Sequence, residues 1–272
     1  MLGAFQTPEL ITGLEQGLEP DPQLALWSPS LSPDGLTLFF AAGVNGGDEL
    51  IATATRQELG LAFSPAAPVS SVNSQGQDGT PLLSGDGLSL YFFSTREGGL
   101  GSRDVWRAAR TAMGVDFSTP TLVAGVNGPD DDHLPWLSPD ELTMLWATNR
   151  PGGVGGFDIW IARRAFRSDG FSNIAPLNGV NDAATEGRAV LSRDELTMYF
   201  TSERPGGMGS LDLWLATRST REDAFSVLTN LANLNSSGLD QDPSLSADER
   251  ELMFSSDRDG RMRLWRSVRV CE

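Results

Sequence analysis

Short runs of alternating apolar and polar residues follow one another along the chain, and one such run recurs five times. Its fullest copy is Leu-Ser-Pro-Asp-Glu-Leu-Thr-Met-Leu-Trp over residues 137–146. Every copy has a Ser, an Asp two residues later and an aromatic residue eight later. The anchoring serines, which stand 52 or 54 residues apart, are Ser32, Ser84, Ser138, Ser192 and Ser246. This pattern predicts two strands joined by a tight polar turn, and the steady period predicts a repeat architecture.

Each repeat contains four extended segments, which are clearest in the second copy. We expect its strands at residues 81–84, 89–94, 104–110 and 119–126. The third strand carries an Asp-x-Trp motif in three repeats, as in Asp104-Val105-Trp106. Trp265 takes this position in the fifth repeat, and Ile51 replaces the Trp in the first. Aromatic residues that recur at one strand position are expected to pack between neighbouring sheets.

The two ends of the repeat array complement each other. Residues 5–11 read as a fourth strand with no other strand of its repeat before it, whereas the fifth repeat stops at Glu272 without a fourth strand. Pairing these two parts closes a ring and leaves no exposed sheet edge between the first and last repeats. The sequence therefore predicts an all-β protein with a single domain over residues 1–272. We expect a five-bladed β-propeller of four-stranded antiparallel blades, with the N-terminal strand closing the last blade.

Composition narrows the classes of partner. The 272 residues include 20 Lys and Arg against 36 Asp and Glu, and the net charge of -16 repels phosphate backbones and anionic membranes. Nucleic acid is therefore not an expected partner. No apolar run is long enough to span a membrane, and the first residues do not resemble a signal peptide, so we expect no membrane insertion. The lone cysteine, Cys271, excludes an intramolecular disulfide. Separately, we expect the protein to be a monomer.

The Leu-Ser-Pro-Asp-Glu/Gly core, the aromatic strand after it and the Asp-Ile-Trp strand resemble the WD-like propeller repeat of the TolB family. The resemblance covers nearly the whole chain in five in-phase copies. It implies the propeller fold and a binding or scaffold role in the bacterial cell envelope, hence a periplasmic or extracellular location. TolB proteins have a separate N-terminal domain and more blades, neither of which is visible in this sequence. The resemblance supplies no catalytic residue.

In such propellers the loops between the second and third strands and between successive repeats surround the channel mouth, where binding residues are expected. An acidic residue stands six positions before the anchoring Ser in four repeats, while the first repeat has Leu26: Asp78, Asp132, Glu186 and Asp240. These carboxylates either hold a cation, such as calcium or a cationic side chain, or cap their own turns through backbone N–H groups. His133 is either a metal ligand or a solvated loop residue. No other cofactor is expected.

A second set of charged residues has the pattern Arg-x-Gly-Gly-x-Gly-x-x-Asp in the three middle repeats. It comprises Arg96 with Asp104, Arg150 with Asp158, and Arg204 with Asp212. The glycines do not form a phosphate loop, because no helix and no Lys-Ser/Thr pair follow them. The Arg and Asp of each pair flank a hairpin loop. We expect either a charge-assisted bridge across the base of that loop or a direct role in binding.

The three repeats with this motif have longer loops, at residues 96–103, 150–157 and 204–211, than the other two. We expect these loops to form a raised crescent beside the mouth, with Trp136 and His133 at its centre. Because Trp and Arg anchors contribute much of the binding energy at interfaces, the crescent favours a non-catalytic propeller that binds a protein or peptide. Two alternatives stay open: a lectin-like glycan-binding propeller and a five-bladed glycoside hydrolase. Against an enzyme, the acids occupy equivalent positions and no nucleophile motif is present.

Overall fold

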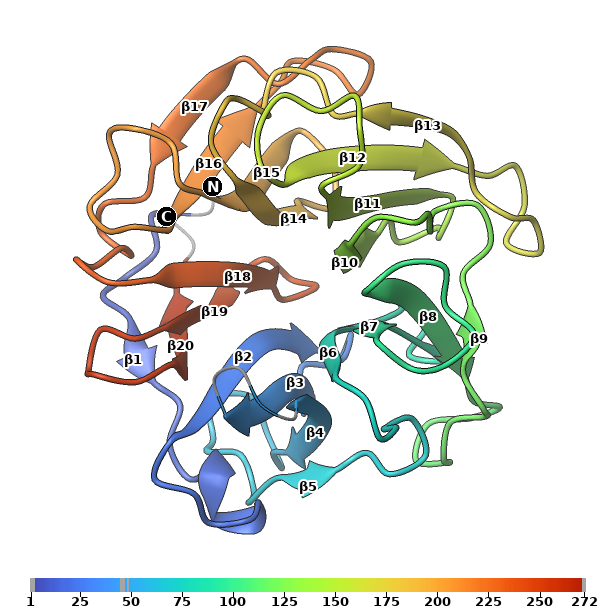
Figure 1. Cartoon of the computed structure of the whole chain (residues 1–272). Coiled ribbons are helices and arrows are strands. Elements are labelled where there is room, and N and C mark those ends of the chain that lie inside the picture. Colours follow the sequence, from blue (N-terminus) through green and yellow to red (C-terminus); the bar gives the residue numbers. More distant parts are fainter. Residues whose placement is uncertain (1–2, 45–46, 48, 271–272) are drawn as a thin grey trace.

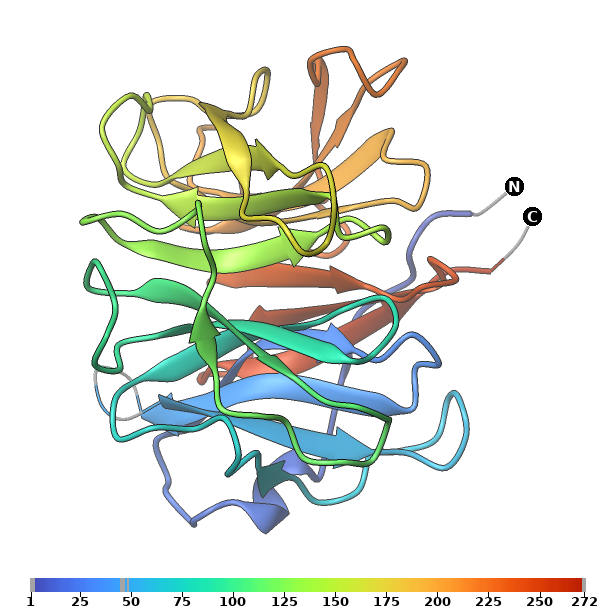
Figure 2. The same cartoon turned by 90° about the vertical axis from the view of Figure 1, so that its right-hand side faces the viewer.

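The computed structural model describes residues 3–44, 47 and 49–270, and Cys271 lies outside them. Five four-stranded antiparallel sheets stand around a common axis as blades (Figure 1). Seen from the side, the blades lie edge-on and their loops gather at two opposite faces (Figure 2). A short 3-10 helix, η1 (Leu14–Gly17), follows the first strand. The prediction of an all-β five-bladed propeller is therefore confirmed.

Each blade runs from an innermost strand beside the axis to an outermost strand at the rim (Figure 1). The innermost strands are β2 (Leu24–Leu31), β6 (Asp78–Leu83), β10 (Asp132–Leu137), β14 (Glu186–Leu191) and β18 (Asp240–Leu245). The second strands are β3 (Thr37–Val44), β7 (Ser89–Ser94), β11 (Thr143–Thr148), β15 (Thr197–Ser202) and β19 (Glu251–Ser256). The third strands are β4 (Glu49–Thr55), β8 (Asp104–Ala109), β12 (Asp158–Arg163), β16 (Asp212–Thr217) and β20 (Arg263–Val268). The outermost strands are β5 (Ala67–Pro68), β9 (Thr121–Leu122), β13 (Ser172–Pro176), β17 (Val227–Asn230) and β1 (Glu9–Leu10).

Two details of the second blade differ from the sequence-based expectation. The innermost strand begins at Asp78 rather than residue 81, because a β-bulge between Gly79 and Leu82 lets the polar stretch before it join the ladder. The outermost strand spans only Thr121–Leu122. The middle strands fall at or within one residue of the expected ranges.

The strand register also corrects one assignment in the first blade. Ala52 lies opposite Phe40, in the register that places Trp106 opposite Phe92 in the second blade. The expectation that Ile51 replaces the Trp is therefore wrong by one residue. Ala52 takes that place.

The N-terminal strand closes the ring. β1 pairs antiparallel with β20, and Leu10 lies opposite Trp265. Backbone hydrogen bonds extend the pairing on both sides, from Gln6 N to Val268 O and from Ile11 N to Leu264 O, each at 2.9 Å. The fifth blade is thus built from both ends of the chain, as predicted.

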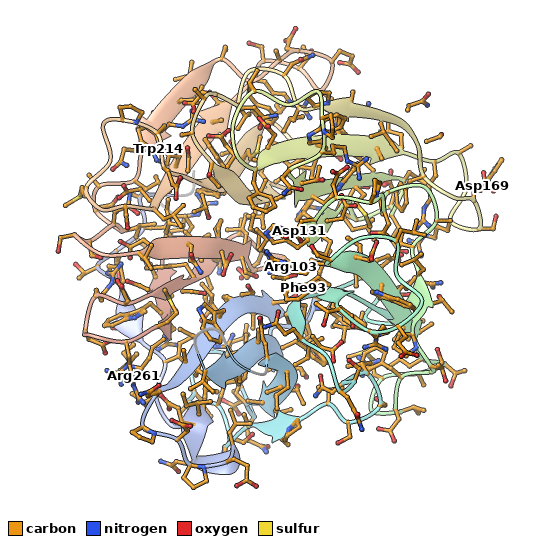
Figure 3. All side chains as sticks on the ribbon, in the orientation of Figure 1. Phe93, Arg103, Asp131, Asp169, Trp214 and Arg261 are labelled. Atoms are coloured by element: carbon orange, nitrogen blue, oxygen red, sulfur yellow. The ribbon has the colours of Figure 1, made fainter. Side chains whose placement is uncertain are left out.

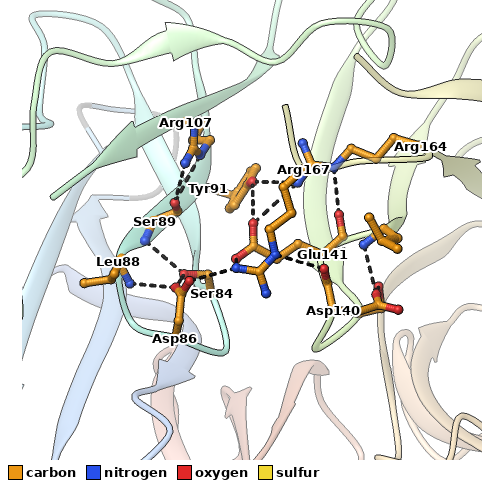
Figure 4. Close-up of polar contacts among 12 residues, drawn as sticks. Ser84, Asp86, Leu88, Ser89, Tyr91, Arg107, Asp140, Glu141, Arg164 and Arg167 are labelled. Atoms are coloured by element: carbon orange, nitrogen blue, oxygen red, sulfur yellow. Dashed lines mark hydrogen bonds and ion pairs between the residues drawn. The ribbon is translucent and has the colours of Figure 1, made fainter. Parts of the chain in front are cut away.

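The first turn of every blade is fixed by its aspartate. Asp34, Asp86, Asp140, Asp194 and Asp248 each accept a hydrogen bond from the anchoring Ser hydroxyl at 2.5–2.7 Å and one from a backbone N–H at 2.9–3.1 Å. The Ser192 hydroxyl and then the Leu196 N–H hold the pKa of Asp194 below its ordinary value. Arg167 reaches from the loop after β12 to Asp86 of the neighbouring blade at 3.0 Å (Figure 4). The turns therefore stabilise single blades and also connect adjacent ones.

The tryptophans of the third strands belong to the core between blades. Trp106, Trp160 and Trp214 are each 7% exposed, and Figure 3 shows Trp214 within its blade. Their apolar clusters include residues of the preceding blade, such as Ile51 with Trp106 and Val105 with Trp160. The prediction of inter-blade packing is confirmed. Within the described part of the chain, no helix has the length and hydropathy needed to cross a membrane.

Candidate binding site at the channel mouth

The four acidic residues predicted at the mouth lie inside the blades. Asp78, Asp132, Glu186 and Asp240 are each 0% exposed. Each accepts a hydrogen bond from the backbone N–H four residues earlier, at 2.5–3.0 Å. Each also pairs with an arginine at 2.5–3.2 Å, as Asp78–Arg96, Asp132–Arg150, Glu186–Arg204 and Asp240–Arg258. The expectation that these carboxylates cap their own turns is confirmed, and Arg258 is a fourth arginine that the sequence pattern missed.

The paired arginines are enclosed by aromatic rings. The guanidinium carbon of Arg96 lies 5.2 Å from the ring centre of Phe92 and 5.3 Å from that of Trp106. The other three arginines have the same surroundings. In the first blade, Leu26 and Val44 stand at the equivalent positions, so both charges are absent together. The acid and the arginine are therefore one structural unit of the blade, and a bound cation would have to displace the arginine.

The expected bridge between Arg96 and Asp104 is wrong, because Arg96 pairs with Asp78 instead. Asp104 accepts the backbone N–H groups of Leu100 at 2.8 Å and Gly101 at 3.0 Å. Asp158 and Asp212 hold the tips of their own loops in the same way. These aspartates therefore shape the three long loops from within.

The three long loops are well anchored and carry apolar tips. A glycine in the left-handed region turns each loop, with φ of +95° at Gly98, +105° at Gly152 and +97° at Gly206. The end of each loop accepts a backbone hydrogen bond from the innermost strand of the next blade, at 2.8–2.9 Å. The tip side chains, at equivalent positions, are Leu100, Val154 and Met208, with exposures of 60%, 65% and 52%. We call these three side chains the apolar crescent.

A pocket of about 320 Å³ lies on the propeller axis at the same face, and we call it the mouth pocket. Figure 3 shows two residues near this part of the axis, Phe93 and Arg103. The aromatic part of the lining is Trp27, Phe93 and Phe157, and the polar part includes Gln77, Gln241, Glu49 and Asp242. Such a mixture of flat apolar surface and a few polar groups is typical of ligand sites.

The mouth pocket is built from positions at which the repeats differ. The register of β3 with β4 and of β7 with β8 makes Leu50 equivalent to Asp104, and hence Glu49 equivalent to Arg103. The residues just before this point in the five blades are Glu49, Arg103, Phe157, Leu211 and Met262. Four residues before the anchoring Ser, the blades have Ser28, Thr80, Leu134, Arg188 and Asp242. Positions shared by the repeats hold the fold, whereas eight of these ten variable residues line the mouth pocket, all but Arg188 and Met262.

Two carboxyl groups of the mouth pocket, those of Glu49 and Asp242, have no ion pair with any described residue. Burial raises the pKa of Glu49 to about 7, and the nearby Asp242 adds to the rise while Arg103 opposes it. Burial also raises the pKa of Asp242, while Arg188 and the Ser28 hydroxyl, which donates a hydrogen bond to this carboxylate at 2.9 Å, oppose the rise. Gly79 leaves room for Glu49, since a Cβ there would come within 2.1 Å of Oε1. A cation entering the pocket would meet two carboxyl groups that form no ion pair, although Arg103 and Arg188 act on them at longer range.

The expectation that His133 is a solvated loop residue is wrong, because it lies in β10 and lines the mouth pocket as a neutral ring. It is 9% exposed, and burial, with Arg103 adding to the effect, lowers its pKa to about 3. Its ring meets Phe157 edge-on at 4.8 Å. The 3.9 Å contact of its Nδ1 with Asp131 is therefore not an ion pair, and Asp131 pairs with Arg103 at 2.7 Å (Figure 3). Among the described residues, no group of three or more His, Cys, Asp or Glu side chains is arranged to hold a metal ion.

Trp136 does not lie at the channel mouth. It is 7% exposed and lines a pocket at the opposite face. The reason is that β10 runs from one face to the other, so three residues beyond His133 the chain has advanced by about 10 Å. The expectation that Trp136 forms the centre of the crescent is wrong, and Trp27 is the tryptophan at the mouth.

Comparisons with known proteins support the fold class. No family model and no curated protein matches the chain. An α-L-arabinofuranosidase from Podospora anserina, in complex with cellotriose, matches with a TM-score of 0.65 and 10% identity over 98% of this chain and 96% of that one. A putative TolB from Agrobacterium tumefaciens matches with a TM-score of 0.53 and 18% identity over 93% and 79%. TolB from Acinetobacter baumannii matches with a TM-score of 0.51 and 16% identity over 89% of this chain and 54% of that one, so this chain spans about half its length.

At these identities the matches establish a shared fold. The chain is a five-bladed β-propeller similar in fold to TolB and to five-bladed glycoside hydrolases. Fold alone does not assign a function, because propellers carry unrelated activities on the same scaffold.

Proposed function

We propose that this chain is a non-catalytic binding propeller that recognises a protein or peptide through the face with the mouth pocket and the apolar crescent. The observation that carries the proposal is the repetition of an exposed apolar side chain at one loop position of three consecutive blades. Single exposed apolar residues are common on protein surfaces, whereas an apolar side chain repeated at one loop position, on the same face as a concave site, favours an interaction surface.

The loops are suited to a partner because they are already ordered. Asp104, Asp158 and Asp212 hold the backbone of the tips, and each loop end is bonded to the next blade. A partner that docks on the tips therefore loses little binding energy to ordering of the loops. An apolar segment of the partner would contact Leu100, Val154 and Met208.

The mouth pocket adds a preference for positive charge. Glu49 and Asp242 lack an ion-paired arginine or lysine among the described residues, and the aromatic side chains of Trp27, Phe93 and Phe157 line the same pocket. A Lys or Arg side chain of the partner gains both charge pairing and cation–π contact in such a pocket. The net charge of -16 attracts a basic partner at longer range.

The test is a selection of random displayed peptides on the immobilised protein. We expect the enriched sequences to combine Lys or Arg with apolar residues, and we expect them to bind the Glu49→Gln/Asp242→Asn variant about tenfold more weakly or worse. A matched control, Glu58→Gln/Asp116→Asn, removes the same charges from exposed loops at the opposite face and should bind as the wild type does. The proposal fails if no peptide is enriched, or if both variants bind equally well.

Glycoside hydrolysis is a second candidate, favoured by the two carboxyl groups with raised pKa in one pocket. A carboxyl group whose pKa is near neutrality is still partly protonated at neutral pH and can act as a general acid. A second, ionised carboxylate is its usual partner in glycoside hydrolysis. The Podospora anserina protein that shares the fold is an arabinofuranosidase.

This candidate is tested by incubating the protein with 4-nitrophenyl α-L-arabinofuranoside and with arabinoxylan. Product release by the wild type that is lost in Glu49→Gln would make the chain a glycosidase and replace the non-catalytic proposal. Absence of turnover between about pH 5 and pH 8, where one carboxyl can be protonated and the other ionised, would remove the enzymatic candidate.

A further inference from the structure

The channel has a second opening at the opposite face, where a pocket of about 380 Å³ lies among the turns after the innermost strands. We call it the distal pocket. The residues that follow the anchoring serines surround it: Pro33, Gly85, Pro139, Arg193 and Ala247. Deeper in the pocket, Leu82, Trp136 and Val190 from three consecutive blades form an apolar wall. Ser30 and Ser244 complete this ring in the other two blades.

Arg188 lines the distal pocket as a buried cation with free N–H groups. It is 1% exposed. Its Nη2 donates to Pro81 O at 3.1 Å, whereas Nε and Nη1 make no hydrogen bond with any described residue. Burial lowers its pKa to about 10, and Asp242 opposes the shift, so the guanidinium stays charged at neutral pH. A buried cation of this kind is unfavourable until an anion or water accepts its N–H groups.

Among the described residues, no carboxylate at this opening accepts an N–H group of Arg188. Glu249 accepts the backbone N–H of Arg193 at 2.6 Å and pairs with Arg269 at 3.4 Å. Arg193 is itself exposed at the rim and adds a second positive charge. Asp242, which lines the mouth pocket, opposes the fall in the pKa of Arg188 but accepts none of its N–H groups. Among the residues that line the distal pocket, Arg188 and Arg193 are the two cations and Glu249 is the one acid.

We propose that the distal pocket binds a small organic acid, with its carboxylate on the free N–H groups of Arg188 and its apolar tail against Leu82, Trp136 and Val190. Charge-assisted hydrogen bonds to a carboxylate satisfy the buried guanidinium better than neutral acceptors do. The apolar wall favours a ligand with a hydrocarbon tail over a hydrated inorganic anion. This site is distinct from the mouth pocket, whose carboxyls favour a cation.

The proposal is tested by calorimetric titration of the purified protein with hexanoate. Acetate keeps the carboxylate without the tail, hexan-1-ol keeps the tail without the charge, and hexylamine reverses the charge. We expect hexanoate to bind at least about tenfold more tightly than acetate or hexan-1-ol, and hexylamine not to bind at this pocket.

Two variants assign the binding to the distal pocket. Arg188→Met removes the charge while keeping the length of the side chain, and it should weaken hexanoate binding by about tenfold or more. Arg103→Met makes the same change of charge at the other opening and should leave hexanoate affinity unchanged. Ala247→Trp narrows the rim from an exposed position and should also weaken binding, which provides a second test should Arg188→Met not fold.

Three results would overturn the proposal. One is that hexanoate produces no binding, which would mean that Arg188 is satisfied by water alone. Another is that hexan-1-ol or hexylamine binds as well as hexanoate. The third is that hexanoate binds the Arg188→Met variant or, where that variant does not fold, the Ala247→Trp variant as tightly as the wild type. Peptide selection probes the opposite face of the propeller. These results therefore neither support nor contradict the proposed function of the mouth pocket, which has its own test.

Discussion

The guanidinium groups of Arg96, Arg150, Arg204 and Arg258 each meet a buried carboxylate and two aromatic rings. Arg188 forms no ion pair and no ring contact with a described residue, since Asp242 acts on it only at longer range, and it lines the channel. At the scale of the residue, the arginines that maintain the fold therefore differ from the arginine available to a ligand in whether the guanidinium forms an ion pair. A charge that is paired within its blade maintains the blade, and a charge left unpaired at the axis is available to a ligand.

The pairing can be tested in the fifth blade, outside the apolar crescent. Asp240→Leu alone leaves the partly buried Arg258 without its counter-ion and should lower the free energy of unfolding by about 3 kcal/mol. The double variant Asp240→Leu/Arg258→Val copies the Leu26 and Val44 of the first blade and should recover at least half of this loss. Chemical denaturation measures both. A double variant less stable than the single one would show that the pair is not a unit.

Glu49 gives a stability prediction whose sign depends on pH. Between its unfolded pKa of 4.5 and its folded pKa of about 7, the folded protein keeps a proton that the unfolded chain releases. The free energy of unfolding of the wild type should therefore fall as pH rises through this window. Glu49→Gln does not titrate, so it should exceed the wild type in stability at pH 8 by on the order of 1–3 kcal/mol and lose that advantage below pH 4.5. A Glu49→Gln variant less stable than the wild type at pH 8 would contradict the conclusion that burial raises the pKa of Glu49.

At the scale of the element, the repeated turn is the best-determined part of each blade. Its Asp accepts hydrogen bonds from the hydroxyl of the anchoring Ser and from one backbone N–H, so a few adjacent residues determine the geometry of the turn. For this reason the sequence predicted the turns and the middle strands well. The innermost strands were placed less well, because the bulge in each of them depends on pairing with its neighbour rather than on local sequence.

The turn aspartate is expected to be structural and not part of a binding site. Asp140→Ala removes the acceptor for the Ser138 hydroxyl and the Leu142 N–H and should lower the free energy of unfolding by about 1 kcal/mol. Binding of the selected peptides should stay at the wild-type level, because this turn lies at the face opposite the mouth pocket. Thermal denaturation and peptide titration check the two halves of the prediction. Unchanged stability with lost binding would reverse the assignment.

At the scale of the whole molecule, the ring depends on its closure by β1. Deletion of residues 1–12 removes the fourth strand of the last blade and uncovers the core beside Phe5 and Ile11. We expect the melting temperature to fall by roughly 5–10 °C, since an edge and an apolar face are exposed together. A control, Gln6→Ala/Glu9→Ala, keeps the backbone pairing and should melt within about 2 °C of the wild type. Identical melting of the truncated and full-length proteins would refute closure by this strand.

Repetition also explains why the fold could be predicted from the sequence, whereas the residues of the site could not. Asp78, Asp132, Glu186 and Asp240 recur because every blade needs the same internal pair, so their recurrence points to structure. A channel has one axis, and a ligand there meets each blade at a different angle, so its contacts need not recur. Glu49, Asp242 and Arg188 stand at positions that vary between repeats. Variation at positions facing the axis was the available signal, but locating the axis required the register of the strands.

The central claim is that the apolar crescent and the mouth pocket bind the same protein or peptide partner. It is tested most directly by calorimetric titration of a selected peptide onto two triple variants. Leu100→Asp/Val154→Asp/Met208→Asp changes the crescent, and Leu61→Asp/Val115→Asp/Phe166→Asp changes three exposed apolar residues of loops at the opposite face. We predict that the first variant, still folded, binds the peptide at least about tenfold more weakly, while the second retains wild-type affinity. Equal affinity for both variants would contradict the claim.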